Sequence, residues 1–140
     1  MSSRTTVVRP VLVLNPELPA WLLANTAAVL GASIGSRERV HIGPDTSDAS
    51  GTTWQGIAEI GVPVLAASPK ELAELRDLAQ QAGLTALAFT EDAQGSRTYE
   101  QYTAAIVTKT THEMVVHGLA LLGDSRRIRK LTKDLLPLGS

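Results

Sequence analysis

The chain has 140 residues, of which 44% are hydrophobic and 19% are charged, with a formal net charge of −1 and no cysteine. This composition is typical of one globular domain, expected here over residues 1–140, and it excludes a disordered chain, a disulfide framework and a cysteine-rich metal site. A nearly neutral chain has no overall attraction to nucleic acid, so a nucleic-acid partner is not expected.

The N-terminal residues contain no charged region followed by a long apolar core. The apolar run from Leu18 to Leu30 is too short and too rich in alanine to span a bilayer. We therefore expect a cytoplasmic protein with no membrane segment.

The first third of the chain predicts a buried strand followed by a helix. Val7-Val8 and residues 11–14 are aliphatic and β-branched, which favours a strand that starts or is interrupted at Pro10. The helix is predicted to begin near Pro19, and because it is apolar nearly all round, we expect it to be buried on most faces. Residues 36–56 alternate β-like pieces with turn residues, which indicates a hairpin or an irregular excursion.

The middle of the chain predicts a strand, a helix and a second strand. Residues 62–66 and 84–89 are the strands, and they should be parallel with a right-handed crossover. Between them Ser68 is the expected N-cap of a helix, Pro69 its first residue and Glu71 the partner in a capping box. Gly83 is expected to end this helix.

The last third predicts a polar loop from Thr90 to Arg97, a short helix near residues 99–107, a strand over 114–122 and a basic helix over 124–133. Together these elements predict an α/β fold: a single three-layer domain with a small mixed β-sheet of about four strands flanked by helices.

Four stretches of this chain resemble the type II peptidyl-tRNA hydrolases, and more closely an uncharacterised bacterial family related to them. They are Glu17-Leu18, residues 25–28, residues 69–84 and the closing segment from Gly118. The resemblance implies a peptidyl-tRNA hydrolase II-like fold. The hydrolases carry a glycine–lysine run before the helix and a Gln-Cys-x-His-Ala signature within it. Here residues 17–25 contain no lysine, and neither Cys nor His follows Asn25, so the scaffold is expected to persist while the activity has changed.

Asn25 and Asp92 are the candidate catalytic residues. Asn25 stands at the place of the family's glutamine, and Asp92-Ala93 resembles the hydrolases' later Asp-Ala loop. An asparagine cannot act as a base, so Asn25 would orient water or stabilise an oxyanion. If buried, it needs a partner. The alternative is structural: Asn25 bonds the backbone of a neighbouring loop, and Thr26 bonds back to its own helix.

The candidate substrate-binding residues come from the same helix and from the loop after the parallel strand 84–89. Ligands of open α/β sheets bind beyond the carboxyl ends of the strands, which favours a pocket wall here. The alternative is an ordinary solvated loop. The candidates are Trp21, Thr26, Gln94, Arg97 and Tyr99.

No metal or cofactor is expected. His41, His112 and His117 lack any paired ligand spacing, and no phosphate-binding loop or Gly-x-Ser-x-Gly elbow is present. His117 is predicted to lie on the last strand in phase with Val115, as a packed side chain. The basic face of the terminal helix is either solvated or a phosphate contact.

Two functions from different classes remain open. The first is an enzyme that cleaves or rearranges an ester or amide of a small molecule. The second is a non-catalytic dimeric binding or interaction protein, because a four-stranded sheet leaves edges to cover. Peptidyl-tRNA hydrolysis is a third alternative. The expected partners are a small-molecule ligand or substrate and a second copy in a homodimer.

Overall fold

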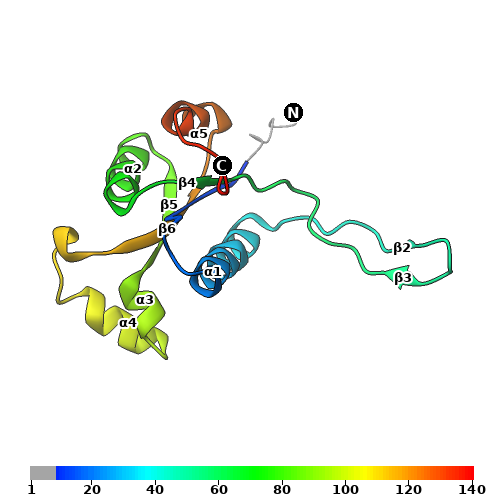
Figure 1. The fold of residues 1–140 in the computed structure, drawn as a ribbon, viewed down its shortest axis with the longest axis horizontal. Helices are drawn as coiled ribbons and strands as arrows, with labels where there is room; N and C mark the ends of the chain where they lie inside the picture. Colours follow the sequence, from blue (N-terminus) through cyan, green and yellow to red (C-terminus); the bar gives the residue numbers. More distant parts are fainter. Residues whose placement is uncertain (1–8) are drawn as a thin grey trace, which may run out of the picture.

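The centre of the protein is a four-stranded mixed sheet with the strand order β4-β1-β6-β5, seen in a computed structural model that describes residues 9–140 (Figure 1). Strand β1 (Val11–Leu14) is parallel to β4 (Val64–Ala66) and antiparallel to β6 (Val116–Leu122), and β6 is antiparallel to β5 (Thr85–Thr90). Strands β1, β4 and β5 therefore point the same way. The predicted parallel direction of β4 and β5 is confirmed, although they lie at opposite edges of the sheet.

The outer edge of β4 is covered by the end of the chain. The amide of Ala66 donates to the carbonyl of Leu136 at 2.8 Å, and the amide of Leu138 donates to the carbonyl of Val64 at 2.9 Å. This edge therefore has no row of open backbone groups of the kind that invites a second sheet.

Helices cover both faces of the sheet and give three layers (Figure 1). Helix α1 (Ala20–Glu38) packs on one face, and α2 (Pro69–Gln81) and α5 (Ser125–Thr132) pack on the other. Leu12 and Leu14 belong to the α1 side, whereas Val13 and Leu119 belong to the α2 side, as the alternation along a strand requires. The expected three-layer α/β fold with a mixed four-stranded sheet is confirmed.

Helix α2 begins where its capping residues predict. The Ser68 hydroxyl accepts from the amide of Glu71 at 3.2 Å, and the Glu71 carboxylate accepts from the amide of Ser68 at 2.9 Å. Gly83 follows the end of the helix with a φ of +74°, a conformation that costs glycine little.

Helix α1 is longer and more exposed than the sequence predicts. Only one residue per turn is buried, namely Leu22, Thr26, Leu30 and Ile34. The expectation that α1 is buried on most faces is wrong, because within residues 9–140 the sheet is the main layer that packs against this helix. Its outer face carries small side chains, Trp21, which is 62% exposed, and the charged Arg37 and Glu38 at its end.

Strand β5 runs directly into a helix instead of a loop. Helix α3 (Glu91–Gly95) starts at once because the Thr90 hydroxyl accepts from the amide of Ala93 at 3.2 Å. The predicted polar loop over 90–97 is thus wrong in its first half. Helix α4 (Tyr99–Ile106) and a 3-10 turn, η1 (Thr111–Glu113), lead to β6.

The hairpin expected within residues 36–56 is present and extends away from the sheet (Figure 1). Its strands are β2 (Thr46–Ser47) and β3 (Thr53–Trp54), and they pair only with each other. Among the residues that the structure describes, no helix is long and apolar enough to cross a membrane. Val7 and Val8, expected as the start of the first strand, lie outside the described residues.

Candidate functional site

The carboxyl ends of β1, β4 and β5 lie at the same end of the sheet, where β6 begins. Asn15 at the end of β1 is buried, and its amide donates to the carbonyl of His117 at 3.0 Å. Thr90 at the end of β5 is also buried. Open α/β sheets bind their ligands at this end of the strands, so its polar side chains are the first candidates for a site.

Asp92 projects from α3 into an ion pair. Its Oδ1 accepts from the Lys109 ammonium at 2.6 Å, and the Asp92 side chain is only 8% exposed. The hydrogen bond to Asp92 raises the pKa of Lys109 above its ordinary value, which keeps the ammonium charged. The pair ties α3 to the segment that follows α4. Asp92 is therefore held as an anchored carboxylate.

Gln94, also on α3, forms a hydrogen bond with the ring of His117. The Nε2 atom of His117 lies 3.1 Å from Oε1 of Gln94. Because a carbonyl oxygen only accepts, Nε2 carries the proton and Nδ1 keeps its lone pair. Burial lowers the pKa of His117, which favours this neutral ring at pH 7.

A β-bulge turns His117 toward α1. The register passes from Phe89 opposite Gly118 to Thr90 opposite Val116, so His117 is the extra residue. Its ring centroid lies 6.3 Å from that of Phe89, on the α1 side of the sheet. The bulge breaks the alternation between Val116 and Gly118, and the phase of His117 with Val115 stays a prediction.

Three buried polar atoms at this end of the sheet have no hydrogen-bond partner within residues 9–140. They are Oγ1 of Thr26, Oδ2 of Asp92 and Nδ1 of His117. The expectation that Thr26 bonds back to its own helix is wrong. Its methyl group instead faces Gly118, where an added Cβ would lie 2.9 Å from it. Buried polar atoms left open in this way need a function or a bound water to explain them.

Asn25 does not take part in this arrangement. Its side chain is exposed, so the premise that it is buried is wrong, and within the described residues it makes no hydrogen bond to residues 91–99. Trp21 lies one turn earlier on the same exposed face of α1. The catalytic role of Asn25 and the binding role of Trp21 stay predictions that no contact supports.

Arg97 and Tyr99 do come together, in a groove between α1, the α1-side face of β5 and α4. We call it the arginine groove, and its volume is about 540 Å³. Helix α1 contributes Ser33 and Arg37, which sequence reasoning missed; their spacing of four residues puts both on one face of the helix. The other lining residues are Val29, Leu30, Ala86, Leu87, Ala88, Phe89, Ala93, Ser96, Thr98 and Tyr102.

The arginine groove is positively charged. In the part of the chain described, neither Arg37 nor Arg97 has a carboxylate within ion-pair distance. The backbone amide of Arg97 donates to the Gln101 side chain at 2.9 Å, which fixes the start of α4. Burial raises the pKa of Tyr102, so its hydroxyl stays protonated and can donate.

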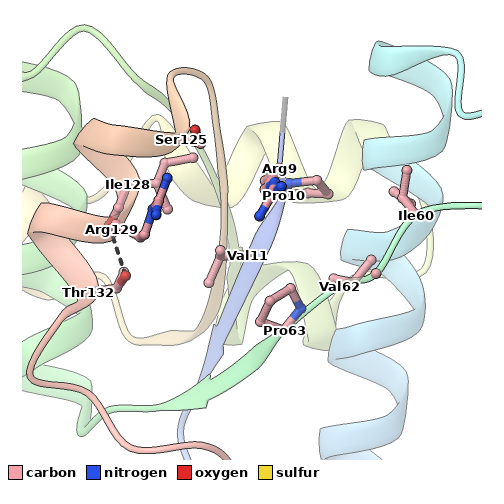
Figure 2. Close-up of a pocket in the computed structure, with 11 residues that line it drawn as sticks. Arg9, Pro10, Val11, Ile60, Val62, Pro63, Ser125, Ile128, Arg129 and Thr132 are labelled. Carbon is pink, nitrogen blue, oxygen red and sulfur yellow. Dashed lines mark hydrogen bonds between the residues drawn. The ribbon is translucent and has the colours of Figure 1, made fainter. Parts of the chain in front are cut away.

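A larger hollow of about 660 Å³ lies at the amino ends of β1 and β4 (Figure 2). It holds none of the predicted site residues. We call it the α5 groove. It runs between α5 and the segment Ile60–Pro63, with Val11 on its floor and Arg9 and Arg129 at its sides. Its walls are mainly aliphatic. The arginine groove is the candidate site because of its side chains, since the size of a hollow alone indicates no chemistry.

Within residues 9–140 no group of three His, Asp or Glu side chains could hold a metal ion.

Comparisons with known proteins add a family and a fold. The model of a family described as "Protein of unknown function (DUF2000)" matches residues 8–138. No curated protein matches the chain. Among solved structures, a protein of unknown function from Agrobacterium tumefaciens strain C58 has a TM-score of 0.80 and 18% identity, covering 93% of this chain and 96% of that one. The expected uncharacterised family is thus confirmed, whereas the resemblance to peptidyl-tRNA hydrolases stays a prediction.

Proposed function

Because the chain belongs to the DUF2000 family, whose description names no activity, we propose a function from the site itself: the protein binds a small anionic molecule in the arginine groove. The observation that carries this proposal is the pair Arg37 and Arg97. They come from α1 and from the start of α4, and both line one groove with no carboxylate partner among the described residues.

Both arginines are exposed, so an anion can reach them from solvent. A guanidinium presents a planar fork of donors that matches a carboxylate or a phosphate. The Thr98 hydroxyl lines the same groove and accepts from the amide of Gln101, so its own proton is free for a remaining oxygen of the anion. The hydroxyls of Ser33 and Ser96 already donate to backbone carbonyls and can only accept.

The rest of the ligand is expected to be apolar and small. Leu30, Leu87 and Phe89 form an aliphatic and aromatic wall, and the rings of Tyr99 and Tyr102 lie 5.3 Å apart between centroids. The volume is within the range of small-molecule sites, roughly 300–1,000 Å³. A monocarboxylate or a phosphate monoester with one ring or a short chain fits these features.

Calorimetric titration with phenyl phosphate and with benzoate tests the proposal. Arg97→Gln should weaken binding of the preferred probe about 10- to 150-fold, since hydrogen bonds to a charged group contribute about 1.5–3 kcal/mol. Arg37→Gln should act in the same direction. Arg126→Gln, an exposed residue of α5 outside both grooves, is the matched control. Equal affinities in all four proteins, or no binding of either probe, would contradict the proposal.

Hydrolysis of an ester or amide of such an anion is the second candidate function. It is favoured by Nδ1 of His117, a buried neutral nitrogen with an open lone pair that could accept a proton from water. Oγ1 of Thr26 and Oδ2 of Asp92 are the other open acceptors at this end of the sheet.

Turnover of 4-nitrophenyl esters, measured by the release of nitrophenolate, separates the two candidates. If the protein is an enzyme, His117→Gln should abolish turnover and leave the affinity for phenyl phosphate unchanged. If the wild type cleaves no ester, hydrolysis is contradicted and anion binding is the candidate function that is left. Asn25→Leu tests the remaining catalytic prediction: a loss of turnover would restore Asn25 to the site, although it lies outside the groove.

A further inference from the structure

Residues 41–59 form an arm that projects from the rest of the protein (Figure 1). Its hydrogen bonds are internal. The backbone amide of Gly43 donates to the carbonyl of Ile57 at 2.9 Å, and the backbone amide of Glu59 donates to the carbonyl of His41 at 2.9 Å. At the tip, the Asp48 carboxylate accepts from the indole of Trp54 at 2.9 Å. Within the described residues no hydrogen bond joins the arm to the remainder of the chain.

The arm exposes large apolar side chains that no other part of residues 9–140 covers. Ile42 is 57% exposed, Trp54 63% and Ile57 80%. A two-stranded ribbon standing alone in water is marginally stable at best. These side chains therefore indicate a partner surface.

The total surface of the chain is larger than that of a compact monomer of the same mass. The accessible area is 9574 Å², whereas a compact monomer of 14.8 kDa has about 7,000 Å². A segment of the length outside the described range contributes no more than an unfolded chain would, about 1,300 Å². The remaining excess exceeds the roughly 800 Å² that each partner buries in a stable complex.

We propose that the covering partner is a second copy of this chain, and that the arm of each copy lies in the α5 groove of the other. The arm carries Asp45, Asp48 and Glu59 but no Lys or Arg. The groove offers aliphatic walls for the apolar side chains, with Arg9 and Arg129 at its sides (Figure 2). In the part of the chain described, neither arginine has a carboxylate partner.

Two-fold symmetry brings these surfaces together. The segment Ile60–Pro63, at the base of the arm, lines the α5 groove of its own copy. When two arms lie antiparallel about a two-fold axis, the tip of each reaches the base of the other and so its groove. The contact is independent of the arginine groove and of any ligand there.

Sedimentation equilibrium tests this assembly. The wild type should have twice the chain mass of 14.8 kDa, and Ile57→Asp should have the mass of one chain. Val107→Asp is the matched control, because Val107 is also 80% exposed but lies after α4. It should remain dimeric. A monomeric wild type, or a dimer that Ile57→Asp leaves intact, would overturn the proposal.

A mixing experiment tests where the arm docks. Arg129→Glu should also be monomeric, because a glutamate in the groove repels the carboxylates of the arm. When it is mixed with Ile57→Asp, the unaltered arm of Arg129→Glu can bind the unaltered groove of Ile57→Asp. Dimers that contain one copy of each variant should then form. Failure to recover dimers on mixing would show that the arms contact something other than the α5 groove. Circular dichroism of each variant checks that the sheet is folded, and if Arg129→Glu is unfolded, Arg9→Glu takes its place.

Discussion

The sheet with its helices and the projecting arm are both built from paired strands, but within residues 9–140 only the sheet has its faces covered. Val13, Leu119 and Leu121 are fully buried because helices cover both faces of the sheet. Ile42, Trp54 and Ile57 have comparable hydrophobicity and are exposed, because no layer covers the arm. Strand pairing alone does not stabilise a ribbon; burial of its side chains does.

The largest effect should come from matched deletions of apolar side chains in the two regions. Leu119→Ala removes buried methyl groups between the sheet and α2, so it should lower the free energy of unfolding by about 2–5 kcal/mol. Ile57→Ala in the arm should change it by no more than about 0.5 kcal/mol in dilute monomer. Urea denaturation measures both. A similar loss in the two variants would mean that the arm belongs to the same cooperative unit.

Two glycines sharpen the comparison further. A Cβ at Gly118 would lie 2.5 Å from Cδ2 of Leu14 within the core, so Gly118→Ala should cost about 1–3 kcal/mol. A Cβ at Gly56 would lie 1.7 Å from the carbonyl oxygen of Gly43, which the ribbon cannot accommodate. Gly56→Ala should therefore abolish the dimer while the thermal unfolding of dilute monomer is unchanged. Loss of the folded sheet in Gly56→Ala would contradict the view that the sheet is stable independently of the arm.

A helix cap in the folded body should have a moderate effect. Ser68→Ala removes the acceptor for the amide of Glu71 and should cost about 0.5–2 kcal/mol. The melting midpoint should fall, and the dimer mass at room temperature should not change. An unchanged midpoint would mean that the cap does not stabilise α2.

The smallest effect concerns pH. The pKa of His117 is lowered in the folded protein by burial, so the unfolded chain binds the proton more tightly. Stability is full above the ordinary value of 6.5 and is lost as the pH falls below it. His117→Gln should reduce this loss in melting midpoint between neutral and mildly acidic pH, whereas His112→Gln, an exposed control, should not. An identical pH dependence in all three proteins would show that His117 is not the responsible group.

Elements with local signals could be predicted from the sequence. Helix α2 is specified by Ser68, Pro69 and Glu71, which contact each other within one turn. Helix α3 was missed because its cap, Thr90, is also the last residue of a strand. The polar residues after Thr90 suit a loop equally well, so composition could not decide between the two.

The site depends on contacts between distant parts of the chain, and these could be predicted only in part. Arg97 and Tyr99 were expected at a pocket, and they do line one groove. Arg37 was missed because only the packing of α1 against β5 brings it there. The bulge at His117 is set by the register of two strands, which the periodicity of one strand cannot reveal.

Hydrogen exchange of backbone amides, followed by NMR at concentrations below and above the dimer dissociation constant, tests the central claim most directly. The claim is that the sheet is complete in one chain, whereas the arm is completed only by a second. Amides in the sheet, such as that of Asn15, should be equally protected at both concentrations. Those of Gly43 and Glu59 in the arm should be protected only in the concentrated sample. Equal protection of the arm amides at both concentrations would contradict the account.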